Sequence, residues 1–238
     1  VREEVKKYSD NDKRIKYRKL ENNEGISENT NKALKMAYGD FIVLFDHDDL
    51  LTPDALYEFA SAIEKEPECD CIYSDEDKTD ATGKVFFDAH FKPDYSIDLL
   101  CSVNYICHLF AVRKTLIDQY GGFRSEYDGS QDHDFILRMT EHARKTVHVP
   151  KVLYHWRVHS NSTALDPHAK MYCFDAGKRA IMAHYERVWP QIRIDHMEDG
   201  ISLGIYHTIW AFDEYPLVSV IIPSKDHIED LDKTVRSM

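Results

Sequence analysis

Residues Phe41–Leu51 read FIVLFDHDDLL, an apolar run that ends in the polar group Asp46, His47, Asp48 and Asp49. A short apolar run of this kind predicts a buried strand that delivers a carboxylate cluster to its carboxyl end. Carboxylates in that position can hold a hard divalent cation against an anionic ligand such as a diphosphate. The stretch therefore predicts a site for a metal and an anion at the end of a strand.

A purely structural role competes for part of this cluster. Asp49 and Thr52 can cap a helix that opens at Pro53, because Asp and Thr side chains accept hydrogen bonds from free N–H groups and Pro suits the first turn. Capping does not account for Asp46 and Asp48, whose mutual repulsion beside a buried strand requires a cation or hydrogen-bond donors. For Asp49 both roles, metal ligand and helix cap, remain open.

The composition is that of a globular protein. The 238 residues are 43% apolar and 30% charged, and no apolar stretch is long enough to cross a bilayer. The net charge of −12 argues against a nucleic-acid binder but not against one small anion held by a metal. The five cysteines are odd in number and mostly lie in apolar runs, which indicates reduced thiols in the cytoplasm. The opening residues resemble a solvated helix without a secretory signal, so we expect the chain to start inside a larger protein.

Helical and strand patterns alternate along the first part of the chain. Helices are expected over Val1–Tyr8, Ser27–Met36 and Pro53–Lys65, and strands over Arg14–Leu20, Phe41–Phe45 and Cys71–Tyr73. This alternation predicts a mostly parallel sheet with helices on its faces, and ligands then bind at the carboxyl ends of its strands.

The second part is less regular. A loop is expected over Lys78–Ile97, strands over Ser102–Val112, Val147–Leu153 and Leu217–Ile222, and helices over Lys114–Gln119, Asp128–Arg144, Asp166–Val188 and Ser224–Met238. The segment Tyr154–Thr163, YHWRVHSNST, combines aromatic, histidine and hydroxyl residues, a mixture typical of substrate-facing loops.

Four stretches in this order resemble the family-two glycosyltransferases, which are inverting nucleotide-sugar enzymes with a GT-A fold. They are NEGISENTNKALKMAYGDFIVLFDHDDLLTPDAL, GGFRSEYDGSQDHDFILRM, VLYHWRVHSNST and PLVSVIIPSKDH. The chain is most similar to the bacterial enzymes of surface polysaccharide assembly, which YSDEDK and FKPDYSIDLL fit in particular. The resemblance implies an α/β fold of Rossmann-like GT-A type, with a mixed, mostly parallel sheet flanked by helices.

The resemblance also implies a division of the chain. The family fold normally opens with a strand reading much like VSVIIP, and here that pattern occurs at Val218–Pro223. Residues 1–214 are therefore expected to form a GT-A domain lacking its first strand-helix-strand unit, and residues 215–238 to begin a second such domain. The first domain should expose a strand edge. Our hypothesis places Val218–Ile222 in the vacant position, in the same molecule or by exchange between two.

Sugar transfer from a nucleoside diphosphate requires neutralisation of the departing diphosphate and a base for the acceptor hydroxyl. The resemblance assigns Asp46 and Asp48 to nucleotide and metal contacts, with Asp48 as the direct ligand and Asp46 nearer the ribose. It assigns Asp132, in GSQDHDF, to the general base, although the family more often has Glu where this chain has Gln131. A helix N-terminal charge is the alternative role for Asp132 and Asp134.

Further candidates come from the other matched stretches. Family members often complete the metal site with a histidine, so His155 and His159 are both candidates. Arg157 is a candidate phosphate contact and Trp156 a candidate sugar platform.

The stretch that begins at Glu24 matches the family segment bordering the nucleotide site. Gly25 and Asn31 are its candidate nucleotide contacts, and Ser27 has a competing role as a helix cap. Lys92, Asp94 and Tyr95 are candidates for the acceptor cleft.

These assignments imply transfer of a sugar from a UDP- or dTDP-linked donor to a growing polysaccharide or lipid-linked glycan, with inversion and with Mn or Mg. Expected partners are the donor and the acceptor but no nucleic acid, with a strand-exchanged dimer and peripheral association of the parent protein with the inner membrane face as further hypotheses. A catalytically inactive carbohydrate-binding or scaffolding module is the alternative. A metal-dependent phosphotransferase fits less well, because it requires Thr or Val at Leu50 and a later Ser/Thr and Lys pattern.

Overall fold

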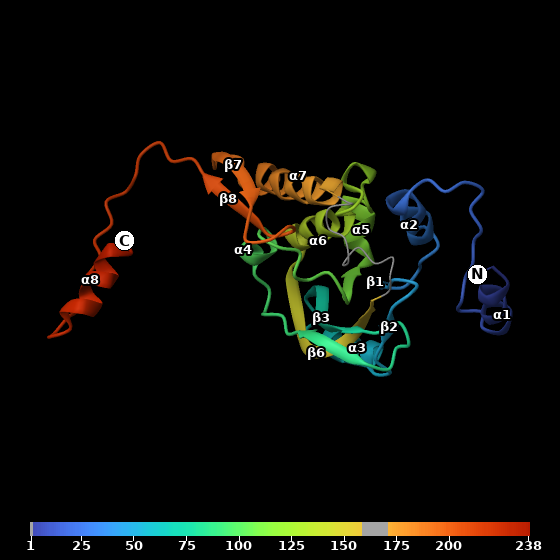
Figure 1. Ribbon diagram of the computed structural model, residues 1–238. Coiled ribbons are helices and arrows are strands. Elements are labelled where there is room, and N and C mark those ends of the chain that lie inside the picture. The colour runs from blue at the N-terminus through green and yellow to red at the C-terminus, as the bar shows by residue number, and fades with distance from the viewer. Residues whose placement is uncertain (1, 159–170) are drawn as a thin grey trace.

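Figure 1 shows the computed structural model of the chain, which describes residues 2–158 and 171–238. Its helices are α1 (Arg2–Asn11), α2 (Ile26–Leu34), α3 (Ala55–Lys65), α4 (Ile97–Leu100), α5 (Lys114–Tyr120), α6 (Gln131–His142), α7 (Met171–Val188) and α8 (Ile228–Arg236), with a short 3₁₀ turn, η1 (Ser125–Tyr127). Its strands are β1 (Phe41–Leu44), β2 (Leu50–Leu51), β3 (Cys69–Thr79), β4 (Phe86–His90), β5 (Phe110–Arg113), β6 (Lys145–Arg157), β7 (Ile194–Asp199) and β8 (Tyr206–Trp210).

Six strands form one mixed sheet in the order β1–β5–β3–β6–β2, with β4 paired to β3. β3 and β6 are parallel neighbours, whereas β5 lies antiparallel between β1 and β3. β1, β3 and β6 consequently share one direction, and β2 and β4 run antiparallel to their neighbours. The expected α/β class is confirmed. The carboxyl end of β1 and the amino end of β5 lie at the same edge of the sheet.

Helices cover both faces of the sheet, as Figure 1 shows. Successive side chains of a strand point to opposite faces. Tyr73 and Phe110 therefore enter a large apolar cluster with residues of α6 and α7, whereas their neighbours Ile72 and Ala111 join a smaller cluster with residues of α3. The fold thus has two apolar layers, one on each side of the central strands.

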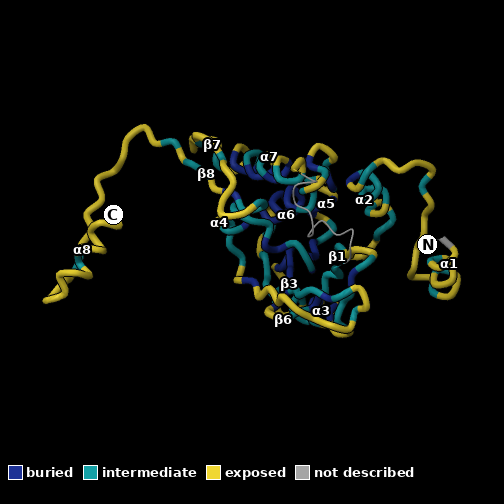
Figure 2. Tube along the Cα trace, in the orientation of Figure 1, coloured by how far each residue is buried: buried dark blue, intermediate teal, exposed yellow. Residues whose placement is uncertain are grey.

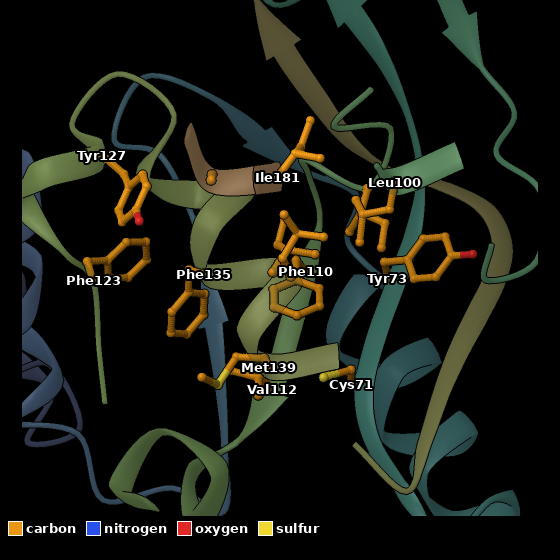
Figure 3. Packing of buried hydrophobic residues seen from close by; sticks show 14 of the residues in the cluster. Cys71, Tyr73, Leu100, Phe110, Val112, Phe123, Tyr127, Phe135, Met139 and Ile181 are labelled. Carbon is orange, nitrogen blue, oxygen red and sulfur yellow. The ribbon is translucent and has the colours of Figure 1, made fainter. Parts of the chain in front are cut away.

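Phe135 of α6 lies in the larger cluster (Figure 3). Its ring meets Phe110 edge to face, at 6.4 Å between centroids and 88° between planes. On its other side Phe123 stacks on it at 4.4 Å. These contacts fix α6, whose first turn carries Asp132, against the sheet.

A two-stranded hairpin of β7 and β8 packs beside α7 and was not expected from the sequence. Tyr206 of β8 lies over Gly177 of α7, where a Cβ atom would be 2.0 Å from the Tyr206 hydroxyl oxygen. Glycine at this position therefore allows the close approach of the hairpin to the helix.

Other expectations need correction. Arg14–Leu20 forms no strand, and β4 lies inside the expected loop Lys78–Ile97. The strand expected over Ser102–Val112 is shortened to β5, since the residues before Phe110 form a loop that packs against Tyr73 and α6.

The two ends of the chain extend away from the central body (Figures 1 and 2). Within residues 2–158 and 171–238 the expected strand Leu217–Ile222 pairs with no other strand, and it is exposed, with Leu217 at 98% and Ile221 at 89%. Val218–Ile222 therefore fills no position in the sheet that these residues form, and its exchange between two molecules stays a prediction. Among the described helices, none has the length and apolar character needed to cross a membrane.

Candidate functional site

Acidic and aromatic side chains meet where β1 ends and β5 begins. Asp46 and Asp49 follow β1, and His108 precedes β5. One carboxylate oxygen of each aspartate and one ring nitrogen of His108 all lie within 4.8 Å of one another, and His108 Nε2 is 4.0 Å from Asp46 Oδ2. We call these three residues the Asp-Asp-His cluster.

Crowding of negative charge is the main electrostatic feature of the site. The pKa of Asp46 is raised, first by desolvation, although 62% of its side chain reaches solvent, and then by the charges of neighbouring aspartates. His108 acts in the opposite direction. The neighbours that raise this pKa are Asp48, Asp49 and Asp132. A cation at the cluster would offset this repulsion.

Asp49 is a buried acceptor and not a helix cap. Its Oδ2 accepts a hydrogen bond from the Tyr154 hydroxyl, and its Oδ1 accepts one from the Arg157 N–H at 2.8 Å. The residue at the N-cap of α3 is Asp54, which makes no capping hydrogen bond through its side chain. The capping role considered for Asp49 is therefore wrong, because its carboxylate accepts hydrogen bonds from residues at the end of β6.

His108 was missed by the sequence analysis. Its ring stacks on Tyr154 with 4.7 Å between centroids and 15° between planes, and it meets Trp156 edge on. The available signal was a histidine inside the apolar run Tyr105–Phe110, where an imidazole needs polar partners.

Asp48 lies beside the Asp-Asp-His cluster without being one of its members. Its side chain is 37% exposed and lies 3.6 Å from His47 Nδ1. Its backbone carbonyl accepts a hydrogen bond from Arg157 Nε at 2.6 Å, and Arg157 Nη1 donates to the carbonyl of Ala81 at 3.0 Å. Arg157 thus links the loop after β1 to the loop after β3, and its predicted phosphate contact stays a prediction.

Of the two predicted histidine ligands, His155 is not part of this cluster. His155 Nδ1 is hydrogen-bonded to Asp77 of β3, and its ring packs against Phe86 of β4. His159 lies outside the described residues.

The structure distinguishes the two acidic residues in the first turn of α6. Asp132 is half-buried, and its Oδ2 accepts a hydrogen bond from Asn104 Nδ2 at 2.8 Å. Asp134 is fully buried and forms ion pairs with Arg124 and Arg138. Asp134 therefore serves the packing of α6, whereas the predicted role of Asp132 as a base stays a prediction.

Gly25 and Asn31 contact the loop before α6. Asn31 accepts a hydrogen bond from the Phe123 N–H and donates one to its carbonyl, both at 2.8 Å. Gly25 has φ 93° and lies so close to Asp128 that a Cβ would be 3.1 Å from its carboxylate. Ser27 donates its hydroxyl to Asp128 and is not the N-cap of α2, which is Gly25.

The acceptor-cleft prediction is wrong for Lys92, whose side chain has no exposed surface. Tyr95 packs against the larger cluster, and burial raises its pKa to about 12. A surface cavity of about 360 Å³ does lie near the site, with Glu76, His90 and Trp156 in its lining. Trp156 therefore keeps its candidate role as a platform for a sugar ring.

The sequence profile of glycosyl transferase family 2 matches residues 1–121 of this chain. The chain belongs to this family. The O-antigen biosynthesis protein RfbC of Myxococcus xanthus is 34% identical over 209 residues, which are 88% of this chain and 16% of that protein. The uncharacterized protein y4gI of Sinorhizobium fredii is 39% identical over 236 residues, 98% of this chain and 26% of that protein. This family 2 chain thus spans about a quarter or less of the length of these relatives.

The family 2 fold is also found among solved structures. Residues 1–349 of S. aureus TarS, in complex with UDP-GlcNAc, match with a TM-score of 0.60 and 18% identity, over 77% of this chain and 53% of that one. This similarity and the family match agree on the GT-A fold expected from the sequence.

The Asp-Asp-His cluster of this family 2 chain fits a divalent metal. Carboxylate oxygens suit Mg²⁺ and Mn²⁺, and imidazole is a common metal ligand. Each oxygen of Asp49 has one protein donor, which leaves a further lone pair on each for a cation. Desolvation is the first cause of the raised pKa of Asp46, and the neighbouring carboxylates, whose charge a cation would offset, raise it further.

Proposed function

We propose that this chain transfers a sugar from a nucleoside-diphosphate donor to a hydroxyl group of a growing polysaccharide or lipid-linked glycan, with inversion and with the help of a divalent cation. The observation that carries the proposal is the Asp-Asp-His cluster, with Asp132 close enough for its charge to raise the pKa of Asp46. Metal ligands for the diphosphate and a nearby base for the acceptor hydroxyl are what such a transfer requires.

The cluster would hold the cation through Asp46, Asp49 and His108, with Asp48 beside them. The bound cation would supply charge neutralisation for the departing diphosphate. Asp48 was our first candidate ligand, and the geometry favours Asp46 and Asp49 for direct contact. Arg157 holds the same loop and is available to a phosphate through its remaining N–H groups.

Asp132 would take the proton of the acceptor hydroxyl. Its Oδ2 is oriented by Asn104, and it lies at the N-terminal end of α6, whose dipole favours the ionised carboxylate. A single base that activates the acceptor leads to direct displacement on the sugar carbon, which inverts its configuration.

The relatives guide the choice of donor and acceptor. TarS was solved with UDP-GlcNAc, so a UDP-linked sugar is the first donor to test and a dTDP-linked sugar the second. The name of RfbC refers to O-antigen biosynthesis, which supports a surface polysaccharide as the acceptor. All five cysteines are free thiols, which supports a reducing compartment such as the cytoplasm, with the inner membrane face as the place of a lipid-linked acceptor.

The test is isothermal titration of the chain with UDP, with and without MnCl₂. We expect UDP binding to require Mn²⁺. Asp46→Asn and His108→Ala should each weaken this binding more than the loss of an outer partner of a metal ligand does, which is typically roughly 10–100-fold. Asp195→Asn and His207→Ala, on the exposed hairpin, are the matched controls and should bind as the wild type does. Metal-independent binding, or equal effects of site and control variants, would refute the metal-assisted function.

A further inference from the structure

A buried ion pair lies beneath the Asp-Asp-His cluster. Lys92 has no exposed side-chain surface, and its Nζ is 3.2 Å from Oε2 of Glu76, whose side chain is 12% exposed. The ammonium group also donates to two backbone carbonyls, that of Ile106 at 2.7 Å and that of His108. All three N–H donors of Lys92 therefore have acceptors.

Glu76 also contacts the backbone of His108. Its Oε2 also accepts a hydrogen bond from the backbone N–H of His108 at 3.2 Å. Lys92 holds the carbonyl of His108 and Glu76 holds its N–H, so the ion pair fixes both peptide groups that flank this residue.

Strand β3 anchors the pair. Asp75, the neighbour of Glu76, accepts a hydrogen bond from the backbone N–H of Lys92 at 2.9 Å and is also bonded to His148. Two consecutive carboxylates of one strand thus hold the backbone and the ammonium group of Lys92. The orientation of His108 is thereby tied to the centre of the sheet.

Stability alone does not explain this arrangement. Burying two charges has a desolvation cost that their attraction offsets only in part, so a buried ion pair contributes little net stability compared with apolar side chains. Burial lowers the pKa of Lys92, and the charge of Glu76 opposes that shift. His90 and Lys92 keep the pKa of Glu76 below its ordinary value against the effect of burial.

We propose that Lys92 and Glu76 are positioning residues that hold the His108 imidazole in place as a metal ligand of the cluster. The ring can stack on Tyr154 and point Nε2 at Asp46 only while the His108 backbone keeps its orientation. Groups that orient a metal ligand commonly contribute 10–100-fold to metal affinity. This inference rests on the proposed function, because it needs the cluster to be a metal site.

The first experiment titrates Mn²⁺ alone into the wild type and into Lys92→Met, which removes all three hydrogen bonds at nearly constant length. We expect Mn²⁺ affinity to fall about 10–100-fold. The matched control is Arg113→Met at the end of β5, which contacts the first residues of β3, about 20 Å from Glu76 by strand length. Arg113 likewise binds one carboxylate and backbone carbonyls, through Asp70, Cys69 and Pro67, so its loss should destabilise the fold without changing Mn²⁺ affinity.

A double-mutant cycle separates positioning from general damage. In the background His108→Ala, the substitution Lys92→Met should cause no further loss of Mn²⁺ affinity, because the ligand that Lys92 orients is already gone. A loss of the same size in both backgrounds would overturn the proposal. If Lys92→Met does not fold, Glu76→Gln serves in its place, since it keeps the shape of the side chain and removes the charge.

A readout without metal distinguishes failure of this inference from failure of the proposed function. In the histidine spectrum of the metal-free protein at a fixed pH, the ring signals of His108 should be shifted by the stacked Tyr154 ring. Lys92→Met should abolish that shift and leave His184 in α7 unchanged. An unchanged His108 signal would overturn the positioning role even if Mn²⁺ binds. A lost shift in a protein that binds no Mn²⁺ would refute only the metal site and, with it, the metal-ligand part of this proposal.

Discussion

The hydroxyl group of Tyr154, near the end of β6, donates a hydrogen bond to Oδ2 of Asp49, in the loop after β1. The same aromatic ring stacks on His108. Burial, and next the bond to Asp49, raise the pKa of Tyr154 well above its ordinary value, so the phenol remains a donor throughout the neutral range. One side chain thus orients two of the three residues of the Asp-Asp-His cluster.

Replacement of Tyr154 by phenylalanine should separate these two contributions. Tyr154→Phe keeps the ring against His108 and removes the donor to Asp49, so we expect Mn²⁺ affinity to fall about tenfold, at the lower end of the effect of lost outer partners. Titration calorimetry with MnCl₂ measures this change. Tyr185→Phe, which removes a hydroxyl bonded to Thr208 beside the hairpin, is the control. Equal affinity of Tyr154→Phe and the wild type would show that this hydrogen bond does not support the site.

The two acidic residues in the first turn of α6 should respond in opposite ways to removal of their charge. Asp132→Asn should reduce sugar transfer about 10²–10⁴-fold, the usual contribution of a general base, and leave UDP binding and the midpoint of urea unfolding close to wild type. Asp134→Asn should reduce the free energy of unfolding by about 3–5 kcal/mol, because Arg124 and Arg138 lose their buried partner. Transfer assays and urea unfolding of both variants test the pair. A destabilised Asp132→Asn that transfers sugar normally would assign that residue to the fold.

Asp70 should make the stability of the chain depend on pH in the acidic range. A side-chain hydrogen bond from Arg144 is the largest of the effects that hold the pKa of Asp70 well below its ordinary value, and Arg113 contributes further. The folded state therefore keeps this carboxylate ionised at a pH where the unfolded chain binds a proton. Its contribution is present above the unfolded pKa of about 4 and is lost as the pH falls through the folded value.

The corresponding variant is Asp70→Asn. We expect its free energy of unfolding at pH 7 to be about 1–3 kcal/mol below that of the wild type, and this gap to narrow as the pH falls below about 4. Urea unfolding at pH 7, 4 and 3 measures the gap. Asp195→Asn, at an exposed site, provides the baseline. A gap that stays constant over this range would mean that ionisation of Asp70 does not stabilise the fold.

Gly177 should tolerate no side chain. A Cβ atom there would lie 2.0 Å from the hydroxyl oxygen and 2.8 Å from Cζ of Tyr206, so we expect Gly177→Ala to cost about 1–3 kcal/mol through overpacking. Thermal unfolding measures the loss. In the background Tyr206→Ala the same substitution should cost little, because the opposing side chain is absent. An equal loss in both backgrounds would contradict this explanation.

The outer edge of β1 offers a place for strand exchange. β1 is at one end of the strand order, and a surface cavity of about 360 Å³ beside it is lined in part by Leu34, Ala37 and Ile42. Exposed apolar residues of Leu217–Ile222 form no strand within the described part of the chain. An unpaired edge and an unpaired β-prone segment favour pairing between two molecules.

We expect a concentration-dependent dimer in light scattering after size-exclusion chromatography. Val220→Asp should keep the chain monomeric, because a charge in the exchanged strand would be buried on pairing. Ile228→Asp in exposed α8 is the control, since it adds the same charge outside the strand segment. A monomer at all concentrations, or the same dimer in Val220→Asp, would exclude exchange through this segment.

The spacing of apolar residues along the sequence predicted the elements in which that spacing is regular. The helices α2, α3, α5 and α6 and the strand β1 lie close to their expected residues. β4 and the β7–β8 hairpin were missed because their residues are mostly exposed and form strands only by pairing with neighbours. For Leu217–Ile222 the error is the opposite one: a strand was predicted and none forms, because a strongly β-prone segment forms no strand without a partner.

The site residues likewise fall into those that the sequence predicts and those that only the tertiary structure reveals. The sequence by itself determined the family, the carboxylates that follow β1, and the acidic start of α6, because these depend on residue type and on position along one element. Only the tertiary structure decided that Asp49 lies in the cluster and not at a helix cap, that Asp134 is a packing residue, and that His108 joins the cluster. The physical reason is that their partners, Tyr154, Arg124 and Asp46, lie on other elements. Such contacts follow from the packing of the sheet and helices, and no periodicity along the chain records them.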